Sequence, residues 1–303
     1  MTIEISGFSK SFLEVLKHNG TYSVNNDNNK LELFTCPINA NQFDYSRMTD
    51  TLYESVADFS ISRKTKEKYS GKPMTLSRKA REKFKEYKKN KGELGEFLLF
   101  CFLEGHLKAP KILSKLELKT STSMYVNGSD GIHFLKLLNG NYQLIFGESK
   151  LYTDLTSGLR DAFNSISDFV KEENDKGDEK SGINYEKSLI SSNIFRESWT
   201  DDEEKFLEQL IYPTTNMEYF VDDAFGIFVG FEIDIDDEIK NLPNDKFRYA
   251  IEKYINDFVS KRIINIENYI QEYNLLGYNF HIYLLPFTDI DNSREKILES
   301  LIK

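Results

Sequence analysis

Residues 128–150 read GSDGIHFLKLLNGNYQLIFGESK, and this stretch contains the pattern that decides the fold. The glycines and small polar residues at 128–131 predict a tight turn, after which 132–138 reads as a strand. Asn139-Gly140 then predicts a hairpin turn in which both central residues take a positive φ. Residues 142–150 form the return strand, whose side chains alternate between two faces.

Two acids and a lysine come together at the open end of this hairpin. Antiparallel pairing brings Asp130, which precedes the first strand, level with Glu148 near the end of the second. Alternation places Glu148 and Lys150 on one face of the return strand and Ser149 on the other. Two ionised carboxylates held a few ångströms apart repel each other, and a bound divalent cation removes that conflict.

Mg²⁺ fits such a site, because it takes one or two carboxylates together with waters and substrate phosphate oxygens. A metal there can activate water for in-line displacement at phosphorus. We therefore expect Asp130 and Glu148 to be metal ligands, with Ser149 as a further candidate ligand and Mn²⁺ as an alternative ion. Lys150, between two acids, should have a raised pKa and position water or stabilise charge. The alternative to a metal site is a surface hairpin whose charged residues at the open end only keep the end of a strand soluble.

A second acidic element precedes the hairpin. Glu93 and Glu96 lie three residues apart at the start of the apolar run 97–103, so they share one face of a predicted helix. Gly92 and Gly95 allow another backbone to come close. First-turn glutamates also complement the helix dipole, and that role accounts for one of them. We expect the other to face the metal and favour Glu96, one turn further into the buried segment.

The order of these motifs resembles the PD-(D/E)xK nuclease core. The pairing of GELGE (92–96) with GSDGIHF (128–134) and GESK (147–150) is more specific, and is similar to the HamA family, the nuclease subunits of the Hachiman anti-phage defence system. The resemblance is firm over residues 91–170. Ser129 stands where the name motif has proline, a position at which these nucleases vary.

By matching positions, the resemblance implies that Asp130 and Glu148 bind the metal, that Lys150 is the catalytic lysine and that Glu93 or Glu96 is the helix acid. It also implies a restriction-endonuclease-like fold, DNA as the substrate, and a superfamily-two helicase partner subunit (HamB-like). The sequence itself has no glycine-rich phosphate loop of the Walker type and no dinucleotide fingerprint, so this chain should not hydrolyse ATP.

Length and composition indicate a soluble α/β protein. The chain has 303 residues, 40% of them hydrophobic, a formal net charge of −10 and two cysteines. Cys36 and Cys101 do not make a disulfide framework, and no signal pattern or membrane-spanning run is present, so we expect a cytoplasmic protein. The four histidines, which are His18, His106, His133 and His281, lie singly without zinc-ligand spacing, and we expect structural or surface roles. His133 should face away from Asp130.

The periodicity predicts a mixed central β-sheet flanked by helices. Residues 1–90 would form an N-terminal α/β extension, and 91–303 a PD-(D/E)xK-like nuclease domain that ends in further strands and helices. The remaining predicted elements are strands at 31–38, 113–126, 224–235 and 279–287 and helices at 8–17, 50–61, 77–91, 154–173, 246–273 and 293–302.

Residues 63–91 have thirteen Lys or Arg and three acids, a balance of +10 in an acidic chain. Such a segment would gather phosphates, or it is a solvated helix face; the two interpretations are compatible. The candidate DNA-binding residues are Lys79, Arg81, Lys85, Lys88 and Lys89, with Arg160 on the later helix.

The sequence thus predicts a metal-dependent DNA nuclease. Two other classes stay open. One is a non-catalytic DNA-binding or partner-docking module with the same fold, and the other is a stand-alone restriction or structure-specific nuclease.

Overall fold

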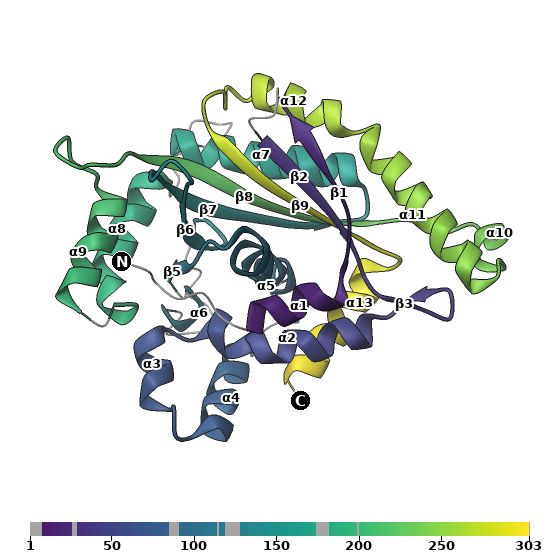
Figure 1. The fold of residues 1–303 in the computed structure, drawn as a ribbon, viewed down its shortest axis with the longest axis horizontal. Helices are drawn as coiled ribbons and strands as arrows, with labels where there is room; N and C mark the ends of the chain where they lie inside the picture. The colour runs from purple at the N-terminus through teal and green to yellow at the C-terminus, as the bar shows by residue number, and fades with distance from the viewer. Residues whose placement is uncertain are drawn as a thin grey trace.

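The computed structural model describes residues 8–25, 29–84, 91–113, 115–118, 128–173, 182–198 and 200–302. Seven strands of this described chain form one mixed sheet in the order β1-β2-β9-β8-β7-β6-β5 (Figure 1). A short hairpin, β3 (Ile38–Asn39) with β4 (Gln42–Phe43), stands apart. The strands of the sheet are β1 (Lys17–Val24), β2 (Asn29–Thr35), β5 (Lys111–Leu113), β6 (Ile132–Lys136), β7 (Tyr142–Tyr152), β8 (Val221–Glu232) and β9 (Asn279–Phe287).

The centre of the sheet is parallel and both of its ends are antiparallel. β8 pairs in parallel with β7 and β9, and β2 continues this direction beside β9. The pairs β1–β2, β6–β7 and β5–β6 are antiparallel. β8 and β9 are nearly continuous apolar runs because parallel strands are covered on both faces. A mixed sheet flanked by helices is the fold class that the sequence predicted.

Helices cover both faces of the sheet. Figure 1 shows α7 and α12 along one side of the strands and α1, α2 and α5 along the other. α5 is buried between the sheet and its neighbouring helices, which explains why its side chains are apolar almost all round. The larger helices are α1 (Phe8–Val15), α2 (Tyr45–Ser60), α4 (Pro73–Arg81), α5 (Glu93–Phe102), α7 (Leu155–Lys171), α8 (Ile183–Asn193), α9 (Asp201–Ile211), α11 (Asn244–Ser260), α12 (Ile263–Glu272) and α13 (Ile290–Ile302).

Shorter helical segments connect these elements. They are α3 (Arg63–Lys68), η1 (Glu82–Phe84), η2 (Leu103–Leu107), α6 (Lys115–Leu118), η3 (Ile194–Arg196) and α10 (Asp237–Lys240). No helix in the described ranges is long and apolar enough to cross a membrane.

The β6–β7 hairpin forms where the sequence predicted it, with a different turn. Leu137 N donates to Asn141 O (2.8 Å), and Gly140 N donates to Leu137 O (3.0 Å). The loop therefore has three residues, and Gly140 has a φ of +88°. Asn139 does not have a positive φ, so the predicted two-residue turn was wrong. In a three-residue loop of this kind only the last position needs the left-handed conformation.

Two predicted elements were also wrong. Of the strand expected at 113–126, only residue 113 lies in a strand, at the end of the three-residue β5, and 115–118 form the helix α6. Residues 119–127 lie outside the described chain, so the prediction is not tested there. The sequence of α6, Lys-Leu-Glu-Leu, consists of good helix formers. The helix expected at 246–273 is divided into α11 and α12. Arg262 donates to Phe258 O (2.7 Å) at the end of α11, which satisfies a terminal carbonyl and favours a stop there.

The N-terminal strands belong to the same sheet as the rest of the chain. β2 pairs with β9 from Lys30↔His281 to Leu33↔Leu284, and β1 forms the edge beyond it. The division of the chain near residue 91 stays a prediction. The helix predicted at 77–91 is represented by the end of α4 and by η1, with 85–90 outside the described residues.

Candidate active site

The open end of the β6–β7 hairpin has the register that the sequence predicted. Asp130 N donates to Gly147 O (2.7 Å) and Gly147 N donates to Gly131 O (2.8 Å). These bonds continue the β6–β7 ladder and place Asp130 opposite Glu148. Gly147 is required here, because a Cβ would lie 2.9 Å from Leu99 Cδ2 and 3.1 Å from Gly131 N.

Asp130 is fixed by Ser149. The backbone N and the Oγ of Ser149 both donate to Asp130 Oδ2, each at 2.7 Å. Burial raises the pKa of the Asp130 carboxyl, while the Ser149 bonds and the charges of Lys150 and Lys115 lower it, and burial prevails. Ser149, a predicted candidate ligand, therefore orients the carboxylate in this structure.

Glu148 and Lys150 share the face of β7 that α7 covers. Lys150 Nζ lies 2.9 Å from Glu148 Oε1, 2.9 Å from Asp161 Oδ2 and 3.2 Å from Ser165 Oγ. Burial and the charge of Asp130 raise the pKa of Glu148 to about 7, although Lys150 opposes the shift. The two carboxyl groups therefore resist ionising together, which is the conflict that the sequence predicted.

The pKa of Lys150 is raised, as predicted. Burial alone would lower it, but the carboxylates of Glu148 and Asp161 outweigh burial. Lys150 therefore stays an ammonium ion at neutral pH. The sequence placed Lys150 between Asp130 and Glu148; its charge acts on Asp130, and its ion pairs are with Glu148 and with Asp161 of α7. No local pattern in 142–150 could indicate a partner from α7.

The N-terminus of α5 lies against the other face of β7. A Cβ on Gly95 would lie 3.0 Å from Ser149 Oγ, so this glycine permits the close approach that its position predicted. Glu96 lines a pocket together with Asp130 and Lys115, whereas Glu93 is buried and is not among the residues that line it. Among the described residues, Asp130 and Glu148 do not belong to any group of three potential ligands whose atoms all lie within 4.8 Å of one another.

Sequence reasoning missed a buried ion pair next to Asp130. Lys115 Nζ contacts Glu186 Oε1 and Ser129 O, and Glu186 Oε1 accepts from Ser129 N (2.8 Å). Burial raises the pKa of Glu186, and so does the nearby Asp130, while Lys115 lowers it. The pair fixes the turn that presents Asp130. Lys115 and Glu186 come from α6 and α8, and neither segment has a motif that could have identified them.

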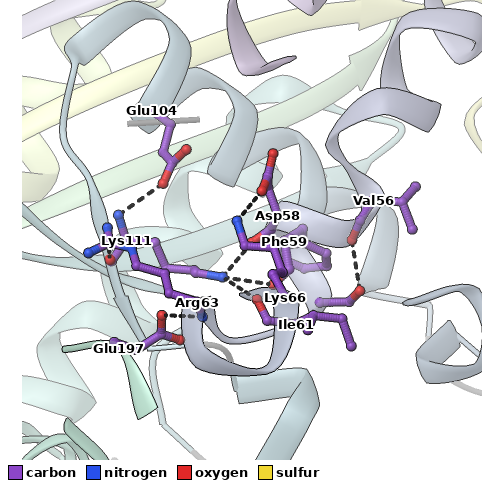
Figure 2. A network of polar contacts seen from close by, with 10 residues as sticks. Val56, Asp58, Phe59, Ile61, Arg63, Lys66, Glu104, Lys111 and Glu197 are labelled. Carbon is purple, nitrogen blue, oxygen red and sulfur yellow. Dashed lines mark hydrogen bonds and ion pairs between the residues drawn. The ribbon is translucent and has the colours of Figure 1, made fainter. Parts of the chain in front are cut away.

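The basic segment begins with a residue that serves the fold (Figure 2). Arg63 is 7% exposed; its Nη2 donates to Lys111 O (3.2 Å) and its backbone N donates to Glu197 Oε2 (3.1 Å). The Nζ of Lys111 donates to carbonyl oxygens of α2 and of the turn that follows it. The backbone N of Lys111 donates to Glu104 Oε1 (3.1 Å). This network joins α2, α3 and β5, and its Lys111 is also one of the residues that line the pocket.

The predicted DNA-binding residues lie in two places. Lys79 and Arg81 are on α4, which packs on α2 at the lower edge of Figure 1; Lys79 Nζ lies 5.3 Å from the centre of the Tyr69 ring. Lys85, Lys88 and Lys89 fall outside the described residues. Arg160 is exposed on α7, the helix that supplies Asp161 and Ser165 to the site.

Two of the histidines, which lie singly in the sequence, come together in the fold. His18 and His106 meet at Glu32 on β2, which β9 and β8 separate from β7 in the sheet. His133 is buried on the face covered by α5, where its Nδ1 donates to Ala109 O (2.8 Å), and burial lowers its pKa to about 3. His281 is also buried, with Nε2 2.8 Å from Gln143 Oε1.

A hard cation and a phosphate oxygen fit the end of this hairpin. The available ligands are carboxylate oxygens, two acids repel each other there, and a fixed ammonium ion stands next to them.

A sequence model of the HamA family matches residues 10–301 of the chain. A search of curated proteins finds no match.

Proposed function

The chain belongs to the HamA family of the Hachiman anti-phage defence system, and on this premise we propose that it is a metal-dependent DNA nuclease. It would hydrolyse phosphodiester bonds as the effector of the defence complex. The observation that carries the proposal is the joint placement of Asp130, Glu148 and Lys150 at one end of the β6–β7 hairpin.

Asp130 and Glu148 are the residues that would hold the metal. Their oxygen donors suit Mg²⁺, with Mn²⁺ as the alternative ion, and the raised pKa of Glu148 supports the need for a cation. Two protein carboxylates are sufficient, since Mg²⁺ keeps several waters and takes phosphate oxygens. Glu96 borders the pocket and would hold a metal-bound water. When bound, the ion would lower the pKa of a coordinated water and neutralise charge at phosphorus.

The other side chains would stabilise charge on the phosphate and hold Asp130 and Lys150 in position. Lys150, protonated between Glu148 and Asp161, would donate hydrogen bonds to a phosphate oxygen or to the attacking water, and it would not act as a general base. Ser149 would hold Asp130 in place through its two bonds to Oδ2. Asp161 and Ser165 would set the position of the Lys150 ammonium group.

A helicase partner would supply strand separation. The chain has no Walker-type phosphate loop, so ATP-driven opening of a duplex needs another subunit. The family belongs to a multi-subunit defence system, which supports a superfamily-two helicase in this role. The acidic net charge supports weak binding of free DNA by the chain alone.

Substrate class and site can be tested together. Wild type and Asp130→Asn would be incubated with labelled duplex DNA, single-stranded DNA and RNA in Mg²⁺, alone and with the helicase subunit. We expect DNA cleavage by wild type and a loss of about 10²-fold or more in the variant, because the metal loses a charged ligand. Asp50→Asn, the same change at an exposed position of α2, is the control. Equal cleavage by Asp130→Asn and Asp50→Asn would contradict the proposal.

A further inference from the structure

A second group of potential metal ligands lies away from the hairpin. His18 on β1, Glu32 on β2 and His106 in the π-helical turn η2 each place one ligand atom within 4.8 Å of the other two. Within the described part of the chain, this is the one set of three His, Cys, Asp or Glu residues that meets this distance. Their spacing in sequence shows no metal motif, because the sheet and the end of α5 bring them together.

Glu32 is the buried centre of the group. Its side chain is 12% exposed, and its Oε2 lies 2.7 Å from His18 Nε2. Thr21 Oγ1 donates to the same oxygen (2.6 Å). A carboxylate held by a neighbouring hydroxyl is the arrangement in which an outer partner orients a metal ligand.

His106 has a comparable outer partner. Its Nδ1 lies 3.3 Å from the hydroxyl oxygen of the buried Tyr283, which leaves Nε2 for a ligand. Burial lowers the pKa of His106, Glu32 opposes this, and His18 and Lys108 add to it, which favours the neutral imidazole. Neutral imidazole is the form that binds metals.

The ring of Phe34 forms an apolar wall of the group. Its centre lies 4.8 Å from that of His18 and 5.4 Å from that of His106. The other side is accessible, since the side chain of His18 is 43% exposed. The group therefore has a buried floor and an open side through which an ion and a water can enter.

We propose that His18, Glu32 and His106 form a binding site for a divalent transition metal of the Zn²⁺ class. Two imidazoles and one carboxylate are a common ligand set for Zn²⁺, with water in the fourth position. Ligand atoms around tetrahedral Zn²⁺ are roughly 3.3 Å apart, so side-chain shifts of about 1 Å would close the site. Lys108 opposes binding through its charge, and the carboxylate of Glu32 offsets it.

A metal at this site would fasten the N-terminal β1–β2 ribbon to the C-terminal end of α5. His106 lies in η2, which continues α5 directly, and the first turn of α5 carries Glu93 and Glu96. The site is distinct from Asp130 and Glu148, and the inference does not depend on nuclease activity.

Co²⁺ is a suitable probe because it replaces Zn²⁺ and absorbs visible light in a way that depends on its geometry and ligands. The titration would use Asp130→Asn, so that the hairpin site does not compete. Zn²⁺ would then be added to displace Co²⁺, with metal content measured on the dialysed protein. Thermal unfolding with and without Zn²⁺ gives a second readout.

The matched variants are Glu32→Gln, which keeps the size of a buried side chain, and Glu54→Gln, the same change at an exposed position of α2. His18→Ala adds a truncation at an exposed ligand. We expect one Co²⁺ per chain with a tetrahedral spectrum, unchanged in Glu54→Gln. Binding should weaken at least roughly tenfold in Glu32→Gln and His18→Ala.

Two results would overturn the inference. One is the absence of a tetrahedral Co²⁺ spectrum and of retained Zn²⁺ in folded protein that has all three residues. The other is equal Co²⁺ affinity in Glu32→Gln, His18→Ala and Glu54→Gln, which would show that the ion binds elsewhere. In thermal unfolding, the second result would appear as a Zn²⁺-induced rise in unfolding temperature that both ligand variants retain.

Discussion

Glu148 is the residue whose ionisation is most affected by the site. Its pKa rises from 4.5 to about 7, so the folded protein retains a proton that the unfolded chain loses between these values. The contribution of Glu148 to stability therefore falls as pH rises from about 4.5 to 7, and the full cost remains above pH 7. A neutral side chain of the same shape avoids that cost.

The first prediction follows from this loss of stability with rising pH. Glu148→Gln should raise the free energy of unfolding by about 1–3 kcal/mol relative to wild type at pH 8, and the difference should vanish near pH 4. Mg²⁺ should stabilise wild type at pH 8 and have little effect on the variant. Urea unfolding at both pH values, with and without Mg²⁺, measures this. A Glu148→Gln variant that is less stable than wild type at pH 8 would contradict a raised pKa of Glu148.

At this scale the sequence predicted part of the site. Asp130, Glu148 and Lys150 could be placed because a hairpin has a fixed register and a period of two. Asp161, Ser165, Lys115 and Glu186 could not, since they come from α6, α7 and α8 and meet the hairpin only through tertiary packing. The same reason explains why the group at Glu32 was missed.

The close packing of α5 on β7 fixes the geometry of the hairpin mouth. Leu99 of α5 covers Gly147, and Gly95 lies against Ser149, so the helix and the strand are in contact where Asp130 is held. Predicted helices and strands were mostly correct where the periodicity was strong, as in α7 and β9. They were wrong at β5 and at the break between α11 and α12, where local propensity and a terminal hydrogen bond decide the structure.

The second prediction concerns this contact. Gly147→Ala should lower the free energy of unfolding by about 1–3 kcal/mol, because the added methyl group meets Leu99 and the backbone of Gly131. It should also lower DNA cleavage, since Gly147 exchanges backbone hydrogen bonds with Asp130 and Gly131. Urea unfolding and a cleavage assay measure the two effects.

Gly71 provides the control for this experiment. It is exposed, and a Cβ there would have no atom within 4 Å. Gly71→Ala should change stability by less than about 1 kcal/mol and should not affect cleavage. If Gly147→Ala were as stable and as active as Gly71→Ala, the close approach of α5 to β7 would not matter for the site.

Over the whole molecule, charge is unevenly distributed. The chain has a net charge of −10, yet residues 63–91 carry a balance of +10. Part of this positive charge serves the fold, as the buried Arg63 shows (Figure 2). Lys79 and Arg81 on α4 stay candidates for contact with DNA phosphates.

The third prediction is the salt dependence of DNA binding. The double variant Lys79→Gln, Arg81→Gln should weaken binding and reduce the slope of log affinity against log salt by about 2 if both residues contact phosphates. Lys246→Gln, Lys253→Gln on α11 removes two exposed charges elsewhere and should leave the slope unchanged. Fluorescence anisotropy with duplex DNA at several salt concentrations measures the slope. Identical slopes for the two double variants would assign Lys79 and Arg81 to a solvated face.

The most direct test of the central claim is plasmid cleavage with and without Mg²⁺ by wild type, Lys150→Met and Lys171→Met, in the presence of the proposed helicase partner. Lys171 is the control because it is exposed at the end of α7. Wild type and Lys171→Met should cut DNA only with Mg²⁺, and Lys150→Met should be about 10²–10⁴-fold slower while remaining folded. Cleavage that does not require Mg²⁺, or that Lys150→Met performs at the wild-type rate, would contradict a catalytic role for the end of this hairpin.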